Sequence, residues 1–100
     1  MRILKKVLCF CIQNSHGQMK PVKRGTKVKQ VPLKIPRYPK DKVSAVMRKD
    51  TYEHIIRILG PGPIYTVTFL EDAEDGRKLY FRLPGGSEEG FLAINFIFVR

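Results

Sequence analysis

Two cysteines and a histidine near the start of the chain are the residues best suited to metal or thiol chemistry. Cys9, Cys11 and His16 lie within eight residues of one another, and thiolate and imidazole are ligands that Zn²⁺ prefers. No fourth ligand lies nearby in the sequence, so we expect no metal site. The cysteines are also too close in sequence to bridge each other well. Beside Lys5 and Lys6, the thiols are suited to S-acylation next to a basic patch; the alternative is a short strand or helix in which reduced thiols pack as small apolar side chains.

The acids, serines and histidines form no recognisable catalytic set. Glu71, Asp72, Glu74 and Asp75 cluster within five residues, where we expect the exposed tip of a hairpin. Paired carboxylates for acid–base catalysis need separated environments, usually inside a cleft, that move their pKa values apart. His54 is expected on the surface of a helix. We therefore predict that the chain is not an enzyme, with no catalytic residue and no cofactor.

Cations dominate the first half of the chain. The 100 residues carry a formal charge of +10. Residues 1–50 hold 14 Lys and Arg against two Asp, whereas residues 51–100 hold five Lys and Arg against seven acids. Cations along an extended segment can contact several phosphates and release counterions. The candidate binding residues are Lys20, Lys23, Arg24, Lys27, Lys29, Lys34, Arg37, Lys40 and Arg82.

This charge pattern favours a non-enzymatic protein that binds nucleic acid, RNA above all, through its amino-terminal arm. Tyr65, Tyr80 or Arg82 on an outer sheet face would stack on bases. One alternative is a membrane-surface or matrix-like assembly protein that uses the basic arm and acylated Cys9 and Cys11. Another is a protein-interaction or inhibitor module. A solvated basic tail without a partner is the simplest explanation of the same charge.

Localisation is expected to be intracellular, in the cytoplasm or nucleus, with membrane association if the two cysteines are acylated. The apolar run Val7–Ile12 is six residues long, shorter than the core of a secretory signal, and no small-residue cleavage site follows it. No apolar run approaches the length of a membrane-spanning helix.

The clearest local element is a helix over residues 50–59. Asp50 suits the N-cap position and Glu53 completes a capping box, while Gly60 and Pro61 end the helix. An apolar face is formed by Tyr52, Ile55, Ile56 and Leu59. Because Val43, Val46 and Met47 fall on the opposite side of the same helix, we expect a break near residues 49–50. Residues 42–48 would then form a separate helical turn or short strand.

A β-hairpin follows, with strands over residues 64–70 and 77–83. A two-residue Asp-Gly turn would place the apolar faces of the two strands on opposite sides of the sheet, which packing forbids. A three-residue loop at 74–76 corrects this and predicts that Phe69 faces Phe81 and Val67 faces Leu83. On the outer face, Asp72 would then face Lys78 and Thr68 would face Arg82.

The remaining segments complete the expected fold. Residues 30–35 alternate apolar and polar side chains between prolines, which predicts an edge strand. Residues 84–90 are expected to form a loop, and 91–99 a central strand that is apolar on both faces and available for homo-oligomerisation. The fold class is therefore α+β, with one capped helix on a three- to four-stranded antiparallel sheet and a basic arm. We divide the chain into an arm (1–40) and a domain (41–100). The expected core is Tyr52, Ile55, Ile56, Leu59, Val67, Phe69, Leu79, Phe81, Ile94 and Phe96.

Overall fold

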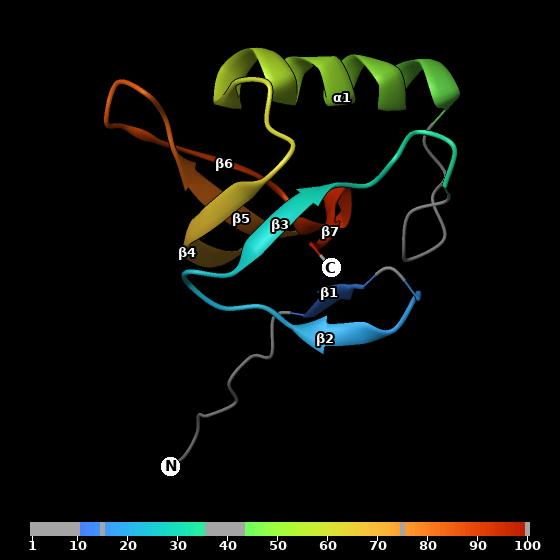
Figure 1. The fold of residues 1–100 in the computed structure, drawn as a ribbon, viewed down its shortest axis with the longest axis horizontal. Helices are drawn as coiled ribbons and strands as arrows, with labels where there is room; N and C mark the ends of the chain where they lie inside the picture. Colours follow the sequence, from blue (N-terminus) through green and yellow to red (C-terminus); the bar gives the residue numbers. More distant parts are fainter. Residues whose placement is uncertain (1–10, 15, 36–43, 75, 100) are drawn as a thin grey trace.

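The described residues of the computed structural model (11–14, 16–35, 44–74 and 76–99) form one α-helix and a seven-stranded mixed sheet. The helix lies across one side of the strongly curved sheet (Figure 1). The sheet order is β2-β1-β7-β3-β4-β5-β6. The elements are β1 (Cys11–Gln13), β2 (Met19–Pro21), β3 (Lys27–Gln30), α1 (Ala45–Leu59), β4 (Tyr65–Ala73), β5 (Gly76–Arg82), β6 (Glu88–Leu92), the 3₁₀ helix η2 (Ala93–Asn95) and β7 (Phe96–Phe98).

The predicted fold class is wrong in the number and direction of strands and in treating the basic segment as an arm. Three strands, β1 to β3, come from this segment, and β3 lies in the middle of the sheet between β7 and β4. β1 runs parallel to β7, with Gln13 opposite Ile97, so the sheet is mixed. The predicted edge strand at 30–35 is also wrong, because β3 ends at Gln30 and a turn follows, closed by Ile35 N–H donating to the Pro32 carbonyl.

The helix is continuous over Ala45–Leu59, so the predicted break at residues 49–50 is wrong. Its N-cap is Ser44, whose hydroxyl accepts a hydrogen bond from the Met47 backbone N–H at 3.2 Å. Val46 and Met47 do lie off the packed face, and they stay 70% and 60% exposed. The helix therefore forms with these two apolar side chains on the side that faces away from the sheet. Gly60 ends the helix with a positive φ of 95°, as its sequence position predicts.

The hairpin forms, but the predicted register is wrong. Val67 faces Phe81 and Phe69 faces Tyr80, so one residue of β4, Thr68, has no opposite residue on β5. This β-bulge puts the extra residue inside the strand rather than in the loop. It resolves the conflict between the two apolar faces, because Val67 stays in the core while Phe69 is moved to the outer face.

The expected pairs on the outer face change with this register. Asp72 lies opposite Arg77 rather than Lys78. Thr68 lies in the bulge and its hydroxyl donates to the Tyr80 carbonyl at 3.1 Å, so it does not face Arg82.

Residues 91–99 do not form one strand. They are divided by η2 into the end of β6, which lies at one edge of the sheet, and β7, which is paired on both sides by β1 and β3. The predicted loop at 84–90 is shorter than expected because β6 begins at Glu88. The prediction of a central apolar strand therefore holds for β7 alone, whose backbone edges are both occupied.

The core lies between α1 and the inner face of the sheet. Five predicted core residues are buried: Ile55, Val67, Leu79, Phe81 and Phe96. Tyr52, Ile56, Leu59 and Ile94 are half-buried, whereas Phe69 is 47% exposed and was wrongly assigned to the core. The core also includes Ile12, Val22 and Val28 from the segment expected to be an arm.

Two polar contacts hold α1 to the segment around β3. The buried Gln30 side chain donates from Nε2 to the Tyr52 carbonyl at 3.1 Å. Near the start of the helix, the Arg48 guanidinium donates to the carbonyls of Ile35 and Pro32 at 2.9 and 3.1 Å. These bonds fix the helix over the inner face and leave the outer face of β3, β4 and β5 uncovered by α1.

Candidate nucleic-acid interface

Two of the predicted binding residues come together on the outer face of the sheet. Lys27 on β3 lies opposite Thr66 on β4, and its Nζ donates to the Thr66 hydroxyl at 3.2 Å. Continuing the β4–β5 register by one residue from the Val67–Phe81 pair places Arg82 opposite Thr66. Because residues directly opposite each other in a ladder share a face, Lys27, Thr66 and Arg82 form a row across three strands.

An aromatic pair, made of exposed Phe69 and half-buried Tyr80, adjoins this row. Phe69 and Tyr80 are opposite each other, with ring centroids 5.6 Å apart in an edge-to-face arrangement. Tyr80 and Arg82 are two residues apart on β5, so they share the outer face. On β6, the residue opposite Tyr80 is Gly90, where any Cβ would lie 2.7 Å from the tyrosine ring. The glycine therefore lets the ring lie flat over β6.

A basic turn reaches the same part of the sheet from the neighbouring strand. Residues 23–26 form a turn closed by Thr26 N–H donating to the Lys23 carbonyl at 3.0 Å. Beyond this turn, Gly25 N–H donates to the Val67 carbonyl and Val67 N–H donates to the Thr26 carbonyl. The turn that carries the exposed Lys23 and Arg24 is thereby held beside Val67, at the start of the bulge in β4.

Acidic groups also touch this face and limit where an anion can lie. The Tyr80 hydroxyl donates to Glu71 Oε1 at 2.5 Å, and Arg82 lies 4.0 Å from the Glu88 carboxylate. The Arg82 side chain is nevertheless 65% exposed. Glu71, Asp72 and Glu74 are exposed toward the hairpin tip. The positive part of the face is therefore the end near Lys27 and Arg24, and the other end repels phosphate.

The other predicted cations do not join this row. Lys20 is exposed on the edge strand β2, and Lys34 is exposed in the turn after β3, near the start of α1. Lys29 lies two residues from Lys27 on β3 and shares its face, but it is half-buried opposite Ile97. Arg37 and Lys40 lie outside the described residues. The basic segment is thus part of the sheet: Lys27 and Arg82 lie in one row, Lys29 shares the face of Lys27, and Lys23 and Arg24 lie in the turn before β3.

Tyr65, one of the expected base-stacking residues, does not belong to this face. It lies opposite Val28, a fully buried residue, and its hydroxyl donates to the Gly60 carbonyl at 2.8 Å. Its ring packs edge-to-face on Phe81 at 6.0 Å. Burial, with a smaller contribution from Tyr52, raises the pKa of Tyr65 above its ordinary value. Tyr65 therefore belongs to the packing between α1 and the sheet.

Phe69 is the residue of this face that the sequence analysis missed. Its place in the alternation of β4, beside Val67, predicted a core side chain. The signal that it is exposed was available in the mismatch between the apolar faces of the two strands. Placing one extra residue at Thr68 brings the apolar faces of the two strands to the same side, and so would placing it in the turn.

The thiol and acid groups do not assemble into a metal centre within the described ranges, where no cluster of three or more His, Cys, Asp or Glu is found. Cys11 is a half-buried, reduced cysteine on β1, and Cys9 lies outside the described residues. His54 is exposed and its ring lies edge-on to Phe91 at 6.2 Å. Among the described residues, no helix, α1 included, is long and apolar enough to cross a membrane.

Comparison of the chain with protein-family models, with curated proteins and with solved structures gives no match.

Proposed function

We propose that this protein is a non-enzymatic RNA-binding protein that holds single-stranded RNA against the outer face of β3, β4 and β5. The observation that carries the proposal is the pair of exposed Phe69 and half-buried Tyr80 beside the cations Lys27 and Arg82 on one sheet face. Proteins that bind single strands combine aromatic side chains on which bases stack with cations that follow the backbone. Such a role belongs inside the cell, in the cytoplasm or nucleus.

In this proposal the residues have separate tasks. Phe69, 47% exposed, presents a ring on which a base would stack, and Tyr80 holds that ring from the side. Lys27 and Arg82 lie along the row that passes the aromatic pair, where the backbone of a bound strand would run. Lys23 and Arg24 extend the positive surface beyond the bulge. The acidic hairpin tip would direct the strand toward the basic end.

The test is the affinity for a fluorescein-labelled oligouridylate, measured by fluorescence anisotropy over a range of salt concentrations. Phe69→Ala should weaken binding roughly tenfold, because stacking contributes about 1–3 kcal/mol per base. Lys27→Gln should also lower the slope of log K against log[salt] by about 0.7, the value for one phosphate contact on a single strand.

Two control variants carry similar changes outside this face. Met47→Ala removes an exposed apolar side chain from α1, and Arg57→Gln removes an exposed cation from the same helix. Both should bind RNA as the unchanged protein does. Unchanged binding by Phe69→Ala, or salt-independent binding, would overturn the proposal. Salt-dependent binding to anionic vesicles without RNA binding would instead support the membrane-surface alternative.

A further inference from the structure

A pocket of about 200 Å³ opens at the end of β3, where β4 no longer runs beside it. Residues of β3, of α1 and of the loop between α1 and β4 line it. The lining includes Tyr52, Tyr65, Pro61 and Pro63, and no acidic residue of the described chain contributes to it. Aromatic and proline rings of this kind form flat walls against which a planar ring can pack.

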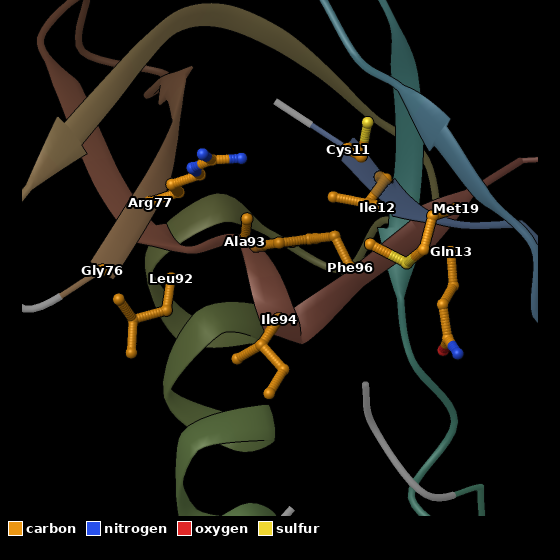
Figure 2. A pocket seen from close by; sticks show the side chains of 10 residues that line it. All are labelled: Cys11, Ile12, Gln13, Met19, Gly76, Arg77, Leu92, Ala93, Ile94 and Phe96. Carbon is orange, nitrogen blue, oxygen red and sulfur yellow. The ribbon is translucent and has the colours of Figure 1, made fainter. Parts of the chain in front are cut away.

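A larger pocket of about 390 Å³ lies elsewhere in the fold, between β1, β2 and β6. Figure 2 shows its mostly apolar lining, which includes Ile12, Leu92, Ala93 and Ile94. The two pockets share no lining residue. The larger pocket therefore offers a place for a matched control substitution.

The pairing of β3 directs the backbone of Gln30 toward the smaller pocket. Val31 N–H donates to the Asn95 carbonyl, at the start of β7. At the other end of β3, Val99 N–H donates to the Lys27 carbonyl. Odd-numbered residues of β3 therefore bond toward β7. Because successive residues of an antiparallel strand direct their backbone groups to alternate sides, the N–H and carbonyl of Gln30 are directed to the β4 side.

The strand pairing stops before it reaches these two groups. β4 begins at Tyr65, opposite Val28, and the same register would place Pro63 opposite Gln30. A proline has no N–H to donate, and within the described chain no hydrogen bond joins the Gln30 backbone to residues 60–64. Gln30 is only 9% exposed, and buried backbone groups are rarely left without a partner. The pocket therefore suits an occupant that carries an acceptor and a donor side by side.

The pocket adjoins the candidate nucleic-acid interface. Lys29 lines it and shares a strand face with Lys27, which belongs to the row of cations across β3, β4 and β5. Two residues along a strand span roughly 7 Å. A nucleic-acid strand that passes Lys27 can therefore reach the pocket without leaving the surface.

We propose that this pocket takes one unstacked base of the bound RNA and pairs with its Watson–Crick edge. The base lies among the tyrosine and proline rings, while Gln30 N–H donates to an acceptor of the base and the Gln30 carbonyl accepts from the neighbouring N–H. In uracil these groups are O4 and N3–H. Sequence-specific RNA recognition reads unstacked bases on this edge. The inference rests on the proposed RNA binding and adds a site that reads one base.

The test changes the ligand and leaves the protein as it is. Binding of a fluorescein-labelled oligouridylate is compared by anisotropy, at fixed salt, with a strand in which every uridine is N3-methylated. The methyl group removes the donor and leaves the Gln30 carbonyl without a partner, so binding should weaken at least about tenfold. A strand of 5-methyluridine, with the methyl group away from the paired edge, should bind as the unmodified strand does.

Two variants locate this discrimination in the pocket. Ile56 is half-buried on α1 and lines the pocket, so Ile56→Phe should fill it and abolish the difference between the unmodified and N3-methylated strands. Ala93→Leu enlarges a side chain in the larger pocket and should leave that difference unchanged. Circular dichroism checks that each variant is folded.

The outcomes separate this inference from the proposed function. Equal binding of the unmodified and N3-methylated strands would overturn the pocket assignment alone, if Phe69→Ala still weakens binding. Loss of affinity with 5-methyluridine as large as with N3-methyluridine would also overturn it, as would discrimination that persists in Ile56→Phe. Absence of oligouridylate binding would overturn the pocket assignment and the RNA-binding proposal together.

Discussion

Deleting Thr68 should leave the fold intact, although Thr68 lies in the longest strand of the sheet. It is the residue of β4 without an opposite residue on β5, between the pairs Val67–Phe81 and Phe69–Tyr80. Its removal joins two residues that already point to opposite faces, so every observed pairing on both sides can be kept. The interaction lost is the hydrogen bond from its hydroxyl to the Tyr80 carbonyl, a net contribution of about 1 kcal/mol. With some loss of strand curvature, we expect a cost of about 1–2 kcal/mol.

The matched control deletes Tyr80 from the facing strand. Leu79 and Phe81 are at most 2% exposed and lie on the same face because one residue separates them. Made adjacent, they must point to opposite faces, so one of them leaves the core. Removing a buried Leu or Phe from a core costs about 2–5 kcal/mol. This is a large fraction of the roughly 5–15 kcal/mol of a domain this size.

Urea unfolding followed by circular dichroism separates the two cases. The Thr68 deletion should retain a cooperative transition with an unchanged m-value and a slightly lower midpoint. The Tyr80 deletion should move the midpoint much further or abolish the transition. Equal destabilisation by the two deletions would refute the bulge and the outward position of Phe69 that depends on it.

Three smaller perturbations test the helix and its attachment. Ser44→Ala should cost about 1 kcal/mol by removing the N-cap acceptor, and Ser44→Asp should restore most of it, as measured by thermal unfolding. Gln30→Ala should cost about 1–2 kcal/mol, because the buried amide bonds the Tyr52 carbonyl; a loss below the error of urea unfolding would contradict that role. The hydrogen bond from Lys49, supported by its charge, lowers the pKa of Glu53 below its ordinary 4.5. The stabilisation from this pair is therefore present above pH 4.5 and is lost as the pH falls through the lowered pKa. An NMR titration of Glu53 should show this, and Lys49→Gln should raise the midpoint.

Local signals predicted the helix end and its buried face but not its start. Gly60 marks the helix end and the spacing of the apolar side chains marks the buried face. Both features depend only on residues within one or two turns of the helix. The start depends on whether Val46 and Met47 need cover, and the structure leaves them exposed on the side of α1 that faces away from the sheet. Asp50, which suits an N-cap, is an ordinary exposed residue inside the helix.

The hairpin shows where the sequence is insufficient. The need for an extra residue between the two apolar faces is visible in the alternation, but its position is not. A third segment of the chain determines this position. Gly25 and Thr26 form hydrogen bonds with both backbone groups of Val67 and hold Val67 in the core. The candidate interface depends on the same contact. Its cations could be predicted, whereas the outward ring of Phe69 could not.

The strands β1 and β2 lacked a usable pattern because each has three residues. Their places in the sheet come from pairing with residues far away along the chain. The basic composition of this segment indicated an extended arm, but its apolar residues, such as Ile12 and Val22, are part of the core.

The pairing of β7 with both β1 and β3 has a consequence for the order of folding. The middle of the sheet is built from residues near opposite ends of the described chain, such as Gln13 and Ile97. Contacts so distant in sequence require a long loop to close before they stabilise anything, which slows folding. During synthesis, β1 and β3 must wait, with one backbone edge each unpaired, until residues 96–98 have been made. Nascent chains that pause before this point would expose those edges, and with them a route to aggregation.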